Sequence, residues 1–212
     1  MSYEGIMEPL GQSQVLRYLE RLVTDHKIVL LSFEKPHDWQ QLARREALRD
    51  QIRVAGIEWI PLRYHKRPSA LATAFDVGQG LVWGTWMVMR HRVHIVHARS
   101  YVPAVIALAL KKLFGVKHIF DMRGFWADER VDGGLWPAGG HLFRMAKWFE
   151  RRLLLNADCV VSLTQAALDE MRTFAYLQGR MPHLEHVTTC ADLNLFRPGR
   201  VEPAPSSDDR PF

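Results

Sequence analysis

Short apolar runs that alternate with longer helical stretches constrain the fold of this chain more than any other feature. The runs rich in branched and aromatic residues are 27–33, 57–62, 93–97, 116–121, 158–163 and 184–189. Continuous apolar runs of this length are typical of strands buried on both faces. Helical stretches lie between them, at about 38–55, 69–92, 102–114, from about 141, and from Thr164, a candidate N-cap, to about Tyr176. This order predicts an α/β fold with a doubly wound parallel sheet.

Both ends of the chain depart from that pattern. Residues 8–14 indicate a turn entering a helix, and such a turn normally follows a strand, yet the few residues before it are not strand-like. We therefore expect the first strand to be missing. Residues 197–211 are polar and proline-rich, as linkers are. The expected organisation is one domain, residues 1–196, and a linker, residues 197–212, toward a second domain that the chain lacks.

Composition and charge exclude several classes of function. The two cysteines lack the spacing of a zinc site, and the chain has no secretory signal, so we expect a cytoplasmic protein. A net charge of +5 favours anionic partners such as nucleotides. Because no RNA- or DNA-reading motif accompanies the basic residues, no nucleic-acid partner is expected. No apolar run is long enough to span a bilayer, which takes about 18 residues.

The strongest candidate site follows the strand at 116–121. Ligands of doubly wound sheets bind beyond the carboxyl ends of the strands. Asp121 and Arg123 are two residues apart at such an end, so in extended geometry their side chains point to the same side. The carboxylate can orient or deprotonate an acceptor hydroxyl, and the guanidinium can stabilise a leaving phosphate. The alternative is a structural ion pair at the end of the sheet.

Three further groups of candidates lie in loops expected at the same edge. Gly11, with Gln12 and Ser13, can offer hydrogen bonds to a diphosphate at a helix N-terminus. Its alternative is a turn that needs a flexible residue.

The second group is Arg99, Ser100 and Tyr101, where Arg99 can meet an anionic acceptor group or form a surface salt bridge. In the third group, Trp126 can stack on a sugar, with Asp128 and Glu129 binding its hydroxyls. The alternatives are a gap-filling ring and solvated acids.

The spacing His91-x-x-His94-x-x-His97 does not indicate a metal site. Residues three apart in a strand face opposite sides, so the three rings cannot converge. We expect ordinary structural histidines and no bound metal.

Three segments carry a resemblance to a known family. They are Gly-Ile-Met-Glu-Pro-Leu-Gly-Gln-Ser-Gln-Val at 5–15, Phe-Asp-Met-Arg-Gly-Phe-Trp-Ala-Asp-Glu at 120–129 and Cys-Ala-Asp-Leu-Asn-Leu-Phe-Arg-Pro at 190–198. Their order and spacing, from about residue 3 to residue 199, resemble the N-terminal, Rossmann-like domain of GT-B-fold glycosyltransferases of the family 4 type. The first segment is fairly specific to one branch of that family, and the third is only supportive.

The resemblance implies an enzyme that transfers a sugar from a nucleotide sugar to an acceptor in cell-envelope or surface polysaccharide synthesis. It implies no cofactor beyond the nucleotide sugar as co-substrate, and retention of anomeric configuration. In this family the N-terminal domain mainly holds the acceptor and the C-terminal domain most of the donor. The residues of that second domain are absent from this chain. We therefore expect little or no activity from the chain by itself.

Two other classes of function stay open. One is a non-catalytic acceptor-binding module, or half of a split enzyme. The other is a different Rossmann-type nucleotide-sugar enzyme such as an epimerase. A dehydrogenase is disfavoured because the chain lacks G-x-G-x-x-G with a downstream acid.

The stretch 81–89 suggests a further partner. It holds Trp83 and Trp86 and is followed by Arg90 and Arg92, a combination typical of peripheral membrane contact. The family resemblance adds a carbohydrate or lipid-linked acceptor, which leaves open a contact with the inner face of the plasma membrane. The apolar run by itself is better interpreted as a buried helix, with both tryptophans as core residues.

Overall fold

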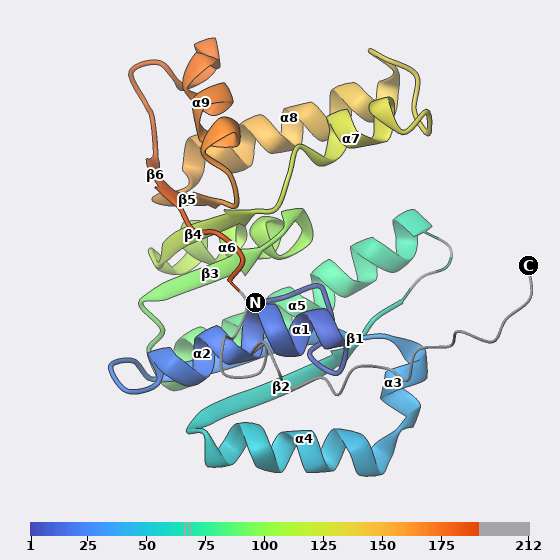
Figure 1. Ribbon diagram of the computed structural model, residues 1–212, viewed down its shortest axis with the longest axis vertical. Helices are drawn as coiled ribbons and strands as arrows, with labels where there is room; N and C mark the ends of the chain where they lie inside the picture. Colours follow the sequence, from blue (N-terminus) through green and yellow to red (C-terminus); the bar gives the residue numbers. More distant parts are fainter. Residues whose placement is uncertain (66, 68, 191–212) are drawn as a thin grey trace, which may run out of the picture.

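The computed structural model describes residues 1–65, 67 and 69–190 (Figure 1). Its strands are β1 (Ile28–Glu34), β2 (Ile57–Arg63), β3 (Ile95–Arg99), β4 (Lys117–Met122), β5 (Cys159–Ser162) and β6 (His183–His186). Neighbours pair in parallel, in the orders β1-β2 and β3-β4-β5-β6. The α/β fold with a parallel sheet is confirmed, and the strands lie within two residues of their predicted starts.

The N-terminal residues join the two sets of strands. Ser2 forms parallel bridges with both Ser32 of β1 and Arg99 of β3. Its amide donates to the carbonyl of Leu31 at 2.9 Å, and the amide of Arg99 donates to the carbonyl of Met1 at 3.0 Å. No regular strand precedes the first helix in the described part of the chain, but these residues occupy the position of the strand that we expected to be missing.

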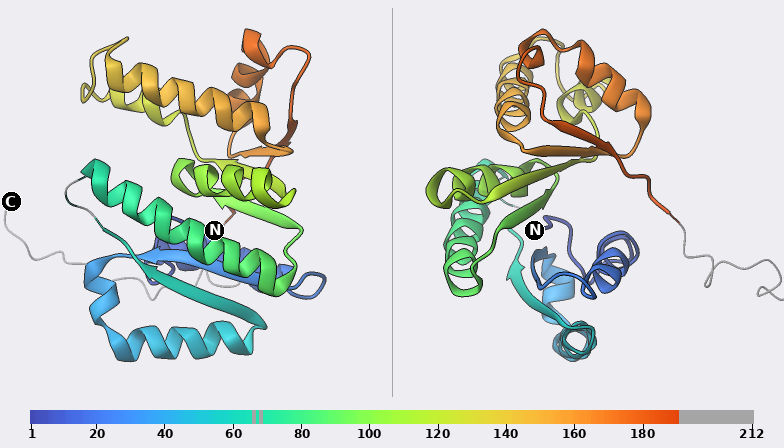
Figure 2. Two further views of the ribbon diagram at one scale, coloured as in Figure 1. Left: turned by 180° about the vertical axis from the view of Figure 1, so that it is seen from behind. Right: turned by 90° about the vertical axis from the view of Figure 1, so that its left-hand side faces the viewer.

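Helices cover both faces of the sheet. The helical elements are α1 (Pro9–Gly11), the π-helix η1 (Gln12–Leu16), α2 (Arg17–Leu22), α3 (Pro36–Gln40), α4 (Leu42–Val54), α5 (Ser69–His91), α6 (Tyr101–Phe114), α7 (Trp126–Asp132), α8 (His141–Asn156), α9 (Gln165–Thr173) and the 3-10 turn η2 (Ala175–Leu177). Helices α5, α6 and α8 lie side by side on one face, and the segment α1–α2, α4 and α9 lie on the other (Figure 2).

Two apolar clusters hold these layers together. The larger joins strands β1 to β5 to α5, α6, α8 and α9 and includes Phe33, Ile106 and Phe120. The smaller joins β1 and β2 to α4 and the helical segment 9–22, through residues such as Leu16 and Trp59. The smaller cluster anchors the helix that brings Gln14 to the edge of the sheet.

The helices differ locally from the sequence expectation. The helix predicted at 38–55 is interrupted at Gln41, giving α3 and α4. The segment 122–140, which we expect from its glycine and tryptophan residues to be a loop, contains α7, so that expectation was wrong there. Asp128 and Glu129 lie in the first turn of α7, where acidic residues interact favourably with the helix dipole. Gly80 lies where α5 packs closely on α6, since a β-carbon there would lie 2.5 Å from the side chain of Ile106.

Some sequence predictions fall outside the described residues. The boundary at 196, the linker at 197–212 and most of the segment 190–198 belong to the undescribed end of the chain. Thr164 does cap α9, its hydroxyl accepting from the amide of Ala167 at 3.2 Å. Over the described residues, no helix is both long and apolar enough to cross a membrane.

Candidate functional site

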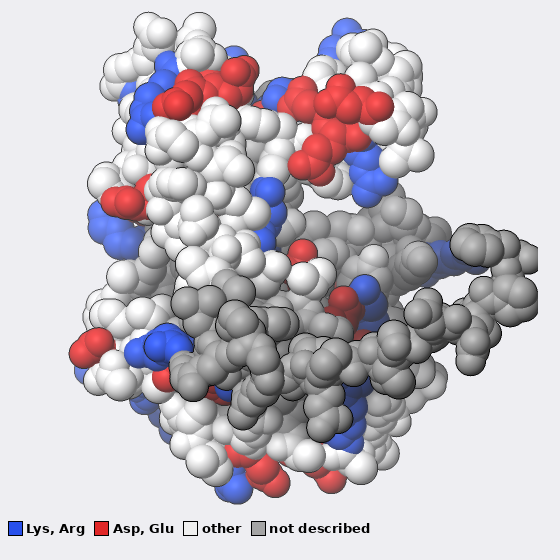
Figure 3. Space-filling model, in the orientation of Figure 1, with Lys and Arg blue, Asp and Glu red and all other residues white. Residues whose placement is uncertain are grey.

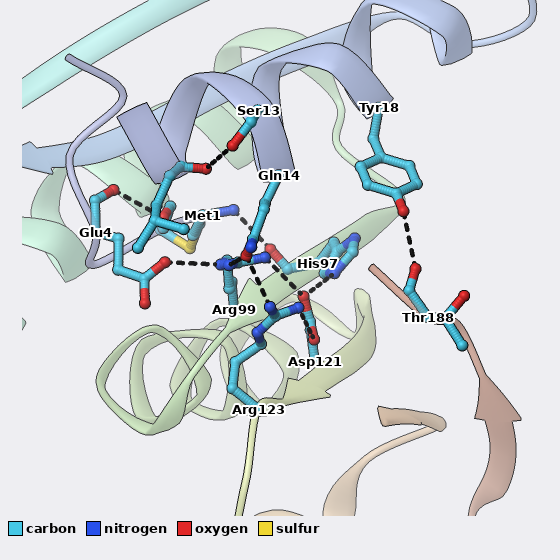
Figure 4. Close-up of polar contacts among 12 residues, drawn as sticks. Met1, Glu4, Ser13, Gln14, Tyr18, His97, Arg99, Asp121, Arg123 and Thr188 are labelled. Atoms are coloured by element: carbon cyan, nitrogen blue, oxygen red, sulfur yellow. Dashed lines mark hydrogen bonds and ion pairs between the residues drawn. The ribbon is translucent and has the colours of Figure 1, made fainter. Parts of the chain in front are cut away.

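A cluster of charged side chains lies at the carboxyl ends of β3 and β4 (Figure 4). Arg99 and Asp121 are register partners on these two strands. Both are buried, and Nη1 of Arg99 lies 3.9 Å from Oδ2 of Asp121. Arg123, just beyond β4, places Nη1 3.9 Å from Oδ1 of Asp121. The structure thus brings together three predicted residues, Arg99, Asp121 and Arg123.

Asp121 is ionised at neutral pH in these surroundings. Burial acts to raise its pKa, but the hydrogen bond and charge of His97 and the charges of Arg123 and Arg99 outweigh burial, so the pKa lies below its usual value. Nε2 of His97 lies 3.5 Å from Oδ2. Oδ1 is itself buried and accepts no hydrogen bond from the described residues; the guanidinium of Arg123 lies 3.9 Å from it.

One amide side chain holds both arginines. Oε1 of Gln14 accepts hydrogen bonds from Nη2 of Arg99 at 2.7 Å and from Nη2 of Arg123 at 2.9 Å. Nε of Arg99 also donates to Glu4 at 3.0 Å. Burial lowers the pKa of Arg123, as does the charge of Arg99, but a guanidinium stays protonated in proteins. Two cations therefore face one site.

Gln14 and Glu4 are functional candidates that sequence reasoning missed. Gln14 lies in η1, a π-helical turn, and such turns are frequent at functional sites. Its predicted neighbours point elsewhere: Nε2 of Gln12 donates to the carbonyl of Met7 at 3.4 Å, and Oγ of Ser13 donates to that of Pro9 at 2.8 Å. The sequence feature that could have pointed to Gln14 is its position in segment 5–15, which resembles the glycosyltransferase family.

The loop before Gly11 is held by a buried carboxylate. Glu34 accepts hydrogen bonds from the amides of Ile6 at 2.9 Å and Met7 at 3.0 Å. Burial raises the pKa of Glu34, and the hydrogen bonds from Ser32 and those two amides act against that rise. These two amides are thus already bound. The role of Gly11 near a diphosphate stays a prediction.

Most of the remaining candidates form a second group, on α6, α7 and α8. The hydroxyl of Tyr101 donates to Glu150 at 2.8 Å, and Lys147 donates both to Glu150 and, at 2.8 Å, to Asp128. Glu150 is fully buried. Burial, and then the charge of Glu150, raises the pKa of Tyr101 far above its usual value. Tyr101 and Asp128 therefore belong to a network that ties α7 to α8.

The last predicted residues lie around that network. Trp126 packs edge-to-face on Trp136, with ring centroids 5.0 Å apart. The carboxylate of Glu129 packs against Gly124, where a β-carbon would lie 2.1 Å from Oε1. Ser100 has a φ of 76°, uncommon for a residue with a side chain, and its amide donates to the carbonyl of Asp121 at 2.9 Å. This strained turn links β3 to the end of β4.

The histidines at 91, 94 and 97 do not share a strand. His91 ends α5, 3.4 Å from Glu58, whereas His97 lies in β3 beside Asp121. Among the described residues, no three His, Cys, Asp or Glu side chains group as metal ligands would.

Comparison with known proteins agrees with this architecture. A family model described as a glycosyl transferase 4-like domain matches residues 12–181. No curated protein matches the chain. The fold is similar to the crystal structure of a UGT transferase from Siraitia grosvenorii in complex with UDP, with 14% identity and a TM-score of 0.55, over 91% of this chain and 50% of that one. This likeness shows the fold, a Rossmann-like half of a GT-B structure. Because the family model covers most of the sequence, the chain belongs to the glycosyl transferase 4-like domain family.

Proposed function

We propose that this chain is the acceptor-side domain of an enzyme that transfers a sugar from a nucleotide sugar to a carbohydrate or lipid-linked acceptor. The observation that carries the proposal is the meeting of Arg99, Asp121 and Arg123 at the carboxyl edge of the sheet in a glycosyl transferase 4-like domain. Such an edge is where doubly wound folds bind their ligands. Cell-envelope or surface polysaccharide assembly is the proposed setting.

Each charged side chain has a chemical role in this proposal. The ionised Asp121, whose side chain is 10% exposed, accepts a hydrogen bond from the acceptor hydroxyl and orients it for attack. Arg123, with Arg99 beside it, stabilises the negative charge that develops on the phosphate leaving with the nucleotide. Fixed charges in a partly buried site do so without reorganising during the reaction.

The donor is proposed to bind mainly to a second domain. This chain spans half the length of the UGT structure, whose title reports a complex with UDP. A cleft between two domains positions both substrates and excludes water, which a single domain cannot do. A non-catalytic acceptor-binding module, or half of a split enzyme, stays the second candidate for the same reason. The epimerase alternative loses support because the matched family consists of glycosyl transferases.

A peripheral contact with the inner, cytoplasmic face of the plasma membrane is part of this proposal. Trp83 and Trp86 of α5 are 39% and 42% exposed, and their rings meet edge-to-face. This exposure contradicts the interpretation of both tryptophans as core residues and supports the proposed contact. A membrane contact of this kind suits an enzyme with a lipid-linked acceptor.

The test is transfer of labelled sugar from a panel of nucleotide sugars to a membrane lipid extract and to oligosaccharides. The protein that carries this domain is compared with its Asp121→Ala and Arg123→Ala variants. Transfer by the parent, lost in the variants at unchanged melting temperature, is the expected result. Saturable acceptor binding without transfer from any donor would instead favour the non-catalytic module.

A further inference from the structure

Helices α5, α6 and α8 each expose large apolar side chains. They form a single layer on the sheet face opposite the N-terminal helical segment (Figure 2). Several large apolar side chains of this layer are exposed: Leu71, Phe75, Val82, Trp83, Trp86 and Met89 on α5, Leu113 and Phe114 on α6, and Leu142, Met145, Trp148 and Phe149 on α8. Apolar side chains gathered on one face mark an interaction surface.

The charge on this face has one sign. The three helices contain only two acidic residues, Asp76 and Glu150, and both are fully buried. Asp76 binds His65 and Tyr3, and Glu150 binds Tyr101 and Lys147. The basic residues of the three helices are Arg90, Lys111, Lys112, Arg144, Lys147, Arg151 and Arg152. The opposite side differs, because acidic side chains gather there over α7 and α9 (Figure 3).

A groove between α6 and α8 combines apolar walls with positively charged side chains. Its volume is about 310 Å³, and its apolar walls come from Val105, Leu108, Trp148, Phe149 and Leu153, with Lys112, Arg152 and Asn156 completing the lining. The guanidinium of Arg152 lies 5.1 Å from the ring centre of Trp148.

The two cations of the groove are free to bind an anion. In the described part of the chain, neither Lys112 nor Arg152 forms an ion pair with a carboxylate. An apolar channel with unpaired cations at its side complements a molecule that has a hydrocarbon tail and an anionic head.

We propose that this groove binds one acyl chain of an anionic phospholipid, whose phosphate lies between Lys112 and Arg152. The proposal rests on the membrane contact proposed above and extends it from α5 to the whole face. A bilayer fits the surface because exposed tryptophans favour the interfacial region and because the described residues of the three helices contribute no exposed carboxylate that would repel anionic lipid. With the lipid in place, α5, α6 and α8 lie on the membrane.

The first experiment measures flotation of the chain with vesicles of phosphatidylcholine containing phosphatidylglycerol, at low and high salt. Lys112→Gln/Arg152→Gln is compared with Arg21→Gln/Arg49→Gln, which removes the same charge from exposed positions on α2 and α4. We expect salt-sensitive binding that weakens at least about tenfold in the groove variant and changes little in the control. Equal losses in the two variants, or no binding, would overturn the proposal.

The second experiment locates the acyl chain. Methyl NMR signals of Val105 and Leu108 are followed while a phosphatidylglycerol with a nitroxide near the end of one chain is added in small bicelles, with Ile52 on α4 as the distant reference. Broadening of the two groove signals alone supports the site. Broadening of neither, or lipid-free shifts on dilution that reveal self-association through this face, contradicts it. Neither readout needs sugar transfer, so failure here is distinguishable from failure of the proposed enzymatic function.

Discussion

A β-carbon on Gly11 would lie 2.1 Å from the carbonyl oxygen of Gly5. Gly11 has ordinary helical torsion angles, with φ −61° and ψ −41°, so this glycine is required by the space and not by the backbone conformation. This close contact packs the helical segment 9–22 directly against the loop that leads to it. The position of that segment determines where Gln14, one turn later, contacts the arginines.

Replacing Gly11 with alanine should therefore destabilise the fold. The obstacle is backbone, which cannot rotate away as a side chain can, and we expect a loss of about 3 kcal/mol or more in the free energy of unfolding. Gly78→Ala is the matched control, because nothing lies within 4 Å of its β-carbon and alanine favours a helix by about 1 kcal/mol. Urea unfolding of both variants gives the comparison. A Gly11→Ala protein as stable as the parent would contradict the steric account.

The sheet could be predicted from the sequence because short runs rich in apolar residues alternate with helical stretches, even where a polar residue such as Glu58 interrupts the run. The residues before Pro9 could not, since Met1 to Tyr3 have no strand pattern of their own and are held by hydrogen bonds to β1 and β3. Helix α7 was also missed, because four of its seven residues are charged and its neighbours in the sequence are rich in glycine and tryptophan. Tertiary contacts with α8 support it.

The candidate site, too, could be predicted from the sequence only in part. Arg99, Asp121 and Arg123 could be predicted because the ends of neighbouring parallel strands meet at one edge. Gln14 reaches them across 85 and 109 residues of sequence, a distance that no local pattern encodes. Tyr101 follows Arg99 by two residues, yet its ring turns to Phe120 and Trp126, away from the charged cluster.

Gln14→Ala should lower sugar transfer without a comparable loss of stability. Both guanidiniums lose the oxygen that orients them, and a site for a developing phosphate charge depends on that orientation. We expect a fall in kcat of about tenfold or more, with KM less affected, whereas Gln12→Ala, beside it, should stay near the parent value. Gln14→Glu keeps the acceptor oxygen and should recover part of the rate. Equal rates for Gln14→Ala and Gln12→Ala would remove Gln14 from the site.

Asp121→Ala and Arg123→Ala should each lower turnover far more than stability. A charged contact made in the transition state is typically worth a factor of about a hundred or more in rate. Steady-state transfer, measured beside thermal melting, separates this effect from unfolding. If both variants melt normally and retain near-normal rates, the cluster is a structural ion-pair network, the alternative that the sequence left open.

Tyr101→Phe should act mainly on stability. The substitution removes the hydroxyl that donates to the buried carboxylate of Glu150, and a hydrogen bond to a buried charge contributes about 1.5–3 kcal/mol. Tyr18→Phe, which removes an exposed hydrogen bond to the carbonyl of Thr188, should cost about 0.5 kcal/mol or less. Chemical unfolding measures both. Reduced transfer by a Tyr101→Phe protein of unchanged stability would show instead that Tyr101 contacts a substrate.

His118 should make the fold sensitive to mild acid. Its ring is fully buried, and neither ring nitrogen has a hydrogen-bond partner among the described residues. Burial, and then the charge of Lys111, lowers the pKa of His118 from 6.5 to about 4. As the pH falls from 6.5 to 4, the unfolded chain gains a proton at this position that the folded chain does not, so stability falls, by about 3 kcal/mol over the window.

The measurement is the slope of unfolding free energy against pH in the parent, in His118→Leu and in His26→Gln, an exposed control. Between pH 6.5 and 4, the unfolding free energy of His118→Leu should depend on pH less steeply than that of the parent, by about 1.4 kcal/mol per pH unit. This difference does not depend on the absolute stability of the variant, because leucine cannot titrate. His26→Gln should retain the parent slope over that window, since the buried ring is still present. Identical slopes in the parent and His118→Leu would mean that His118 is protonated in the folded state as readily as in the unfolded chain.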